Sequence, residues 1–292
     1  MSKAAQHEAG FLLLLAVSSL VAWHPLAATL ALALENDEYT HLLLIVPLSA
    51  ALILRVWSPL RAVVAMEVLS GTALLAVAAS VACAVLLRPP ALSPDVLLSI
   101  AVFALVLFWI GAFVLCFGWR VARSLPFPLC FLFALAPLPK DWMDAVVALL
   151  QQGSAWSAHL LFALLDVPVA QDRVHLAIPG LTLFVAPECS SIRSSSILLV
   201  TTMVLAHLLL RSPSRKAAII ALAVPLSIAK NGLRIFTIAM LGTRVDPRYL
   251  NGKLHRDGGV IFLAMVLVVI FATIVLLRRG DGEPPRPLHE TA

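Results

Sequence analysis

The sequence has little charge. Asp, Glu, Lys and Arg together make up 13% of its 292 residues, whereas 61% of the residues are hydrophobic. This balance lies far outside the range of soluble globular domains. Several windows carry about eighteen or more apolar residues with almost no charge, which is typical of membrane-spanning helices. The sequence therefore predicts an all-α polytopic membrane protein with little soluble mass.

Cysteine is also scarce, and its spacing excludes two common uses. The four cysteines show neither a zinc-binding spacing nor a disulfide framework, so no metal or other cofactor is expected. Cys83, Cys116 and Cys130 lie inside apolar runs, where a small thiol is an ordinary packing residue. Cys189 alone lies among polar residues. The formal net charge of +5 comes from basic residues scattered over loops, so nucleic-acid binding is not expected either.

About eight apolar runs are long enough to be predicted as membrane spans, although prolines interrupt the second and the fifth. The first run is too long for the apolar region of a signal peptide and lacks a small-residue cleavage site, so it is predicted to remain as a span. The predicted spans cover residues 11–34, 38–57, 63–87, 96–119, 121–138, 191–210, 217–242 and 258–277.

The basic residues between these runs predict the orientation of the chain. Lys and Arg are absent from the first loop, ENDEYTH, and clustered in alternate loops, for example RSPSRK at 211–216. Because cytoplasmic loops carry an excess of Lys and Arg, both termini are predicted to be cytoplasmic. One polytopic domain is expected over residues 1–280, followed by a polar, proline-rich and disordered tail at 281–292.

Two segments between the fifth and sixth runs have a different pattern. Residues 143–165 are apolar but contain glutamines, serines and a histidine, so they are predicted as an amphipathic helix on the outer membrane surface. Residues 173–185 alternate with period two on both sides of Pro179-Gly180, which predicts a short β-hairpin. Strand edges leave backbone groups unpaired in lipid, so the hairpin is expected to lie outside the bilayer.

Three unlike polar residues are predicted to reach the same membrane depth. Cys189 precedes the sixth span, His255 precedes the eighth, and Arg234 lies about seven residues, or roughly 10 Å, inside the outer end of the seventh. A cysteine attacks as its thiolate, which helix N-termini and nearby cations favour. His255 is suited to exchange protons with the thiol and a leaving amine, and Arg234 to stabilise an oxyanion.

Other interpretations of the same residues stay open. A cysteine in a membrane protein is usually a packing residue, and Arg234 is also suited to bind a phospholipid or a helix-end carbonyl. Glu188 and Arg193 are compatible with a local ion pair at the helix mouth. A transporter would explain Arg234 as an anion-binding residue, and a non-catalytic scaffold of a polysaccharide-synthesis complex would need no nucleophile. Neither alternative explains the polar stretch around Cys189.

The order of five short motifs resembles the exosortase/archaeosortase family. ECSSIRSS at 188–195, NGLRI at 231–235 and HRDGGVIF at 255–262 are similar to its three main motifs. DEYTH at 37–41 and FPLCFLFALAPLP at 127–139 are similar to two further elements. Ser191 stands where the family commonly has glycine.

The resemblance implies a cysteine protease or transpeptidase of the bacterial inner membrane, with its active site on the periplasmic side. Such enzymes cleave C-terminal sorting tails of exported proteins, each a Pro-Glu-Pro-like motif, a transmembrane helix and a basic cluster, in cells that make exopolysaccharide. The implied partners are these proteins, the lipid bilayer and an acceptor of unknown identity. By this resemblance Cys189 is the nucleophile and Arg234 and His255 complete the catalytic set. Substrate-binding or supporting roles would fall to Glu188, Arg193, Asn231, Tyr39 and His41.

Overall fold

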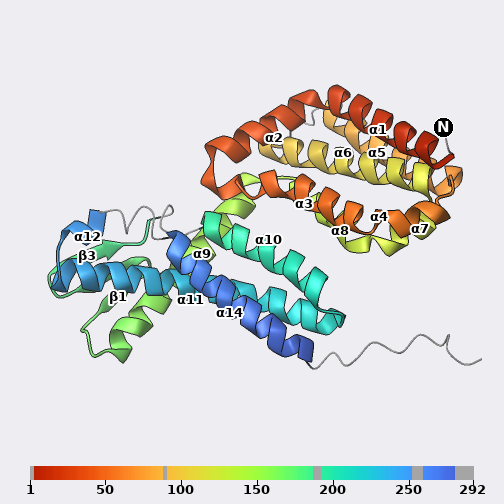
Figure 1. Ribbon diagram of the computed structural model, residues 1–292. Coiled ribbons are helices and arrows are strands. Elements are labelled where there is room, and N and C mark those ends of the chain that lie inside the picture. The colour runs from red at the N-terminus through yellow and green to blue at the C-terminus, as the bar shows by residue number, and fades with distance from the viewer. Residues whose placement is uncertain (1–2, 88–90, 187–191, 252–258, 280–292) are drawn as a thin grey trace, which may run out of the picture. The chain divides into compact units, whose positions relative to one another are not determined.

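The computed structural model describes residues 3–87, 91–186, 192–251 and 259–279, and most of these are helical (Figure 1). The chain divides into two compact units, Met1–Asp144 and Ala145–Ala292, named here unit 1 and unit 2. A single domain over residues 1–280 stays a prediction. The tail predicted to be disordered, 281–292, lies outside the described residues.

Seven of the described helices are long and apolar enough to cross a membrane, which confirms an all-α polytopic membrane fold. The orientation of these helices and the side on which each terminus lies stay predictions. The candidate spans are Ala4–Val21, Asp37–Arg55, Val68–Leu86, Pro94–Phe117, Ile192–Leu209, Pro213–Arg244 and Gly259–Arg278.

Two of the predicted spans differ from the structure. The run 11–34 is divided between two helices, α1 and α2, and only α1 contributes a candidate span. Pro25 lies in the first turn of α2, where a missing backbone N–H is tolerated but a continuous helix is not favoured. The run 121–138 forms short helices, because its prolines interrupt the hydrogen-bond ladder, and its apolar helix covers only Pro126–Leu135.

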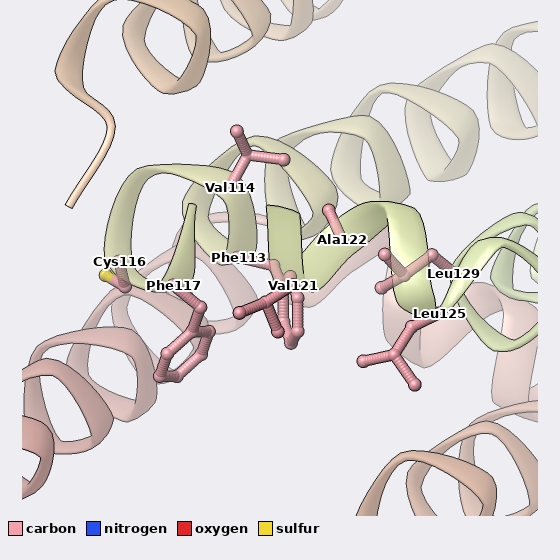
Figure 2. Close-up of a cluster of buried hydrophobic side chains, with 8 residues drawn as sticks. All are labelled: Phe113, Val114, Cys116, Phe117, Val121, Ala122, Leu125 and Leu129. Atoms are coloured by element: carbon pink, nitrogen blue, oxygen red, sulfur yellow. The ribbon is translucent and has the colours of Figure 1, made fainter. Parts of the chain in front are cut away.

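Unit 1 is built on α6, most of whose C-terminal half is buried. A cluster of buried side chains from α6, α7 and α8 includes Phe113, Phe117 and Leu125 (Figure 2). The ring of Phe117 packs edge-on against Trp57, with centroids 4.8 Å apart. The elements of this unit are α1 (Lys3–Val21), α2 (Trp23–Glu35), η1 (Asp37–Tyr39), α3 (Leu42–Arg55), α4 (Trp57–Leu60), η2 (Arg61–Val63), α5 (Val68–Leu86), α6 (Pro94–Phe117), α7 (Trp119–Ser124), α8 (Pro126–Phe131) and η3 (Leu132–Leu135).

Helix α9, Lys140–Leu164, corresponds to the segment predicted as an amphipathic helix. Its buried positions recur three or four residues apart, at Val147, Leu150, Ser154 and Ala158, which confirms one buried face. The helix is not among the candidate spans of the described chain. Its position on the outer membrane surface stays a prediction.

The predicted hairpin is present as β2 (His175–Ile178) and β3 (Leu181–Phe184), and Gly180 has the positive φ of +82° that its turn requires. A third strand, β1 (Ala170–Asp172), pairs antiparallel with β2 and was not predicted. Its three residues, Ala-Gln-Asp, are too few and too polar to show an alternating pattern. The buried side of this sheet packs on α9 and α11 through Leu176, Phe162 and Ala239.

The remaining helices of unit 2 form a second core. Helices α10 (Ile192–Leu209), α11 (Pro213–Arg244) and α14 (Gly259–Arg279) lie side by side (Figure 1) and share a cluster that includes Leu198, Ile219 and Ile270. A short helix, α12 (Arg248–Asn251), packs against α11.

Candidate functional site

The first turn of α10 lies against the middle of α11. The two helices form an antiparallel pair joined by a short loop, so residues equally far from the loop meet. The Lys230 Nζ donates a hydrogen bond to the Ser194 Oγ, and the Ser227 Oγ donates to the Ser195 Oγ at 2.6 Å. The start of α10 is therefore fixed at the level of residues 227–230 of α11.

Arg234 lies on the same face of α11 as this polar contact. Residues 227, 230 and 234 follow one another at intervals of three and four, which places their side chains along one side of a helix. Arg234 is half-buried. Both Lys230 and Arg234 therefore bring cationic side chains to the region where α10 begins.

The start of α14 reaches a similar level. The Arg215 Nη1 donates a 2.7 Å hydrogen bond to the Leu277 carbonyl, which places the first turn of α11 beside the end of α14. Gly259 is eighteen residues before Leu277, and Arg234 is nineteen residues after Arg215. Because each helical residue rises by about 1.5 Å, these antiparallel helices bring Gly259 close to the level of Arg234.

Three of the predicted site residues, Glu188, Cys189 and His255, lie outside the described residues. In the chain, Cys189 is three residues before the first residue of α10, and His255 is four residues before the first residue of α14. The structure thus describes the helix starts that follow these two residues, and it describes the helix that carries Arg234.

Asn231 occupies a buried position that links α11 to α9. Its Nδ2 donates a 2.9 Å hydrogen bond to the Ser154 Oγ, which in turn donates to the Leu150 carbonyl at 2.6 Å. Asn231 is 1% exposed and Ser154 is fully buried. Burying two such polar groups is tolerated because both are hydrogen-bonded. The supporting role predicted for Asn231 is compatible with this contact.

Close helix packing accompanies the Asn231 contact. A Cβ atom at Gly232 would lie 2.4 Å from the Ser157 Oγ and 2.9 Å from the Ala158 backbone nitrogen. Only a residue without a side chain allows α9 and α11 to approach this closely. The polar positions of α11 are thereby held in a fixed register against α9.

Lys230 is a site residue that the sequence motifs did not single out. Its side chain is 2% exposed, and within the described chain it has no carboxylate at ion-pair distance. A buried ammonium group is costly unless it is well solvated by protein groups. The available signal was a lysine inside a predicted span, four residues before Arg234, and such residues are functional candidates by default.

The structure also describes the predicted supporting residues Arg193, Tyr39 and His41. Arg193 is exposed on the first turn of α10. Tyr39 and His41 belong to unit 1, where the Tyr39 hydroxyl donates a 2.9 Å hydrogen bond to the Leu138 carbonyl. The His41 Nδ1 lies 3.1 Å from the Glu38 carbonyl oxygen. Tyr39 therefore joins the two motifs at 37–41 and 127–139 in the fold of unit 1.

Among the residues that the structure describes, no three His, Cys, Asp or Glu side chains gather in a way suited to hold a metal ion. The polar groups present are hydroxyls, an amide and two cations, which favour anions and carbonyl oxygens as ligands.

These features define a multi-pass membrane protein with a cationic, hydroxyl-lined region where helices α10, α11 and α14 meet. Comparison with known families agrees: the model of the family described as "Transmembrane exosortase" matches residues 33–272. The chain belongs to the transmembrane exosortase family. Neither the curated proteins nor the solved structures contain a match to it.

Proposed function

We propose that this chain is a membrane-embedded cysteine protease or transpeptidase that cleaves the C-terminal sorting tails of exported proteins. The observation that carries this proposal is the common level of Arg234 and the starts of α10 and α14. Cys189 and His255 are only three and four residues from those starts along the chain. Only these short segments of chain separate Cys189 and His255 from helix starts that lie at the level of Arg234, so we propose that the three side chains meet there.

Each residue has one role in the proposed reaction. The Cys189 thiol loses its proton to His255, and the thiolate sulfur attacks the carbonyl carbon of the scissile peptide bond. Arg234 stabilises the negative charge that develops on the carbonyl oxygen. The carbon–nitrogen bond then breaks, and His255 returns its proton to the leaving amine. The resulting thioester on Cys189 is resolved by the amine of an acceptor or by water.

The family and the membrane setting support the choice of substrate. The substrate's transmembrane helix would dock beside α10, α11 and α14, so that the peptide bond before it reaches the region of Arg234. We place the enzyme in a bacterial inner membrane, with both termini cytoplasmic and the active site on the periplasmic side. Cells that secrete exopolysaccharide are the expected setting, and the acceptor is a separate molecule.

Substitution of Cys189 tests this function. A reporter protein carrying a sorting tail is co-expressed with the wild-type chain and with Cys189→Ala and Cys189→Ser, and its size is followed on a blot. We expect cleavage by the wild-type chain and none above background by either variant, because alanine has no nucleophile and a serine hydroxyl is far less ionised than a thiol.

Cys83→Ser and Cys130→Ser are the matched controls, since both of these cysteines are exposed in the described structure and both belong to unit 1, whereas Cys189 belongs to unit 2. Their activities are expected to equal that of the wild type. Cleavage that persists in Cys189→Ala would instead assign Cys189 a structural role and contradict its assignment as the nucleophile.

A further inference from the structure

Strand β3 is the last strand of the described sheet, which has the order β1-β2-β3. The Val185 N–H donates a 3.0 Å hydrogen bond to the Val174 carbonyl, and the same register pairs Leu183 with Leu176 and Leu181 with Ile178. Hydrogen-bonded pairs alternate along an antiparallel ladder. The backbone groups of Leu181 and Leu183 therefore point toward β2, and those of Thr182 and the Phe184 N–H point away from it. The Phe184 carbonyl accepts a 3.0 Å hydrogen bond from the Ala186 N–H.

The two faces of β3 also differ. Leu181 and Leu183 pack on the buried cluster of unit 2, whereas the Thr182 and Phe184 side chains lie on the exposed face. The Phe184 ring is 54% exposed and lies against the His175 ring, with centroids 4.9 Å apart. The outward N–H and carbonyl of Thr182 and the outward N–H of Phe184 thus lie beside an exposed aromatic pair.

This edge is held rigidly before any ligand binds. Leu176 of the neighbouring strand is fully buried against α9 and α11. The Gln151 side chain of α9 donates a hydrogen bond to the Val185 carbonyl, which ties the end of β3 to the helix. A preformed strand edge loses little conformational entropy when an extended peptide pairs with it.

We infer that β3 is the docking strand for the extended substrate segment next to the scissile bond, which adds to the sheet as a fourth strand. This inference rests on the proposed function. Phe184 is five residues before Cys189, and five extended residues span at most about 18 Å. A peptide paired with Thr182 and Phe184 therefore has its scissile bond within reach of the proposed nucleophile. The occupant is an extended chain, because only a backbone in that conformation matches the alternating donors.

The pairing sets a rule for the substrate sequence. Every second residue of the docked peptide directs its N–H toward β3, and proline has no N–H to donate. Prolines are therefore accepted at alternate positions, with the residue between them bonded to the strand. A Pro-x-Pro segment of the kind implied by the family resemblance satisfies this rule. An apolar side chain beside the Phe184 ring adds contact area on the exposed face.

Backbone methylation of the substrate tests this inference through binding. The full chain carrying Cys189→Ala is placed in lipid nanodiscs, so that binding is measured without cleavage. The probe is a fluorescent synthetic peptide with a Pro-Glu-Pro-containing motif, methylated on one backbone nitrogen at a time. We expect Kd to rise about tenfold at the residues that donate to β3, and to change little at the non-proline residues in between, since one lost hydrogen bond in a bound complex is worth about that factor.

Thr182→Pro supplies the test from the protein side. It removes the one N–H that points away from β2 at that position and leaves the β2–β3 ladder intact, so peptide binding is expected to weaken about tenfold with unchanged thermal stability. Thr182→Val is the matched control, because it keeps the N–H and removes only the hydroxyl, and it is expected to bind normally.

Equal effects of methylation at all positions, full affinity in Thr182→Pro, or no binding of the unmodified peptide would each overturn the docking inference. None of these results bears on whether the wild-type chain cleaves the reporter through Cys189. Conversely, alternating effects of methylation with no role for Cys189 in cleavage would retain the docking strand and reject the proposed chemistry.

Discussion

Replacement of Arg234 by methionine is expected to lower the rate of reporter cleavage by about two to three orders of magnitude, the cost typical of a lost oxyanion donor. Methionine keeps much of the length and apolar volume of the side chain, so the packing of α11 is largely preserved. The charge and the fork of donors are lost, and with them the stabilisation of the tetrahedral intermediate. The initial rate of cleavage in membranes, normalised to the amount of inserted protein, measures the effect.

Two further variants show whether the loss of cleavage in Arg234→Met depends on the charge of the side chain and on its position in α11. Arg234→Lys keeps the charge but not the planar donor fork, so we expect activity between those of the wild type and the methionine variant. Arg244→Met removes an exposed arginine from the last turn of the same helix and is expected to leave cleavage unchanged. Full activity in Arg234→Met would contradict a catalytic role for this residue.

Replacement of Lys230 by methionine is expected to lower the rate of cleavage without lowering the thermal stability of the chain. We expect cleavage to fall at least about tenfold, because Lys230 is a buried cation one helical turn from Arg234 and would contribute strongly to the electrostatic field at the proposed site. The same change is expected to maintain or raise the thermal stability of the chain. A buried charge costs several kcal/mol where, as among the described residues around Lys230, no carboxylate lies at ion-pair distance, and an apolar side chain of similar volume avoids that cost. Cleavage rate and melting temperature are measured on the same purified samples.

Ser194→Ala is the informative comparison for Lys230→Met. It leaves the buried ammonium group without the hydrogen bond to the Ser194 Oγ, so it is expected to destabilise the chain by about 1–3 kcal/mol. The two substitutions break one contact but shift stability in opposite directions. A Lys230→Met variant that melts earlier and cleaves normally would show that the lysine serves only to hold α10 against α11.

Local patterns in the sequence were sufficient for several elements. The alternation around Pro179-Gly180 predicted β2 and β3, since a two-residue turn and a period of two are visible within a dozen residues. Long apolar runs predicted α10, α11 and α14. This signal is also local, because the length and hydropathy of a span are properties of one segment. The placement of Arg234 inside α11 followed directly.

Contacts between distant segments were not predictable in this way. The Lys230–Ser194 hydrogen bond joins residues thirty-six positions apart, and the close approach of Gly232 to Ser157 depends on how α9 packs on α11. Neither leaves a periodic signal in the sequence. The division of the run 11–34 into α1 and α2 was missed because hydropathy does not register a helix break at Pro25.

The most direct test of the proposed chemistry is detection of the thioester on Cys189. The wild-type chain is mixed with a tail-bearing reporter, quenched in acid and digested with trypsin, which releases residues 174–193 as a peptide with Cys189 as its only cysteine. We predict that mass spectrometry finds this peptide joined to the new C-terminal residues of the cleaved reporter, and that neutral hydroxylamine removes the adduct. Accumulation of cleaved reporter while this peptide stays unmodified throughout the reaction would contradict the account.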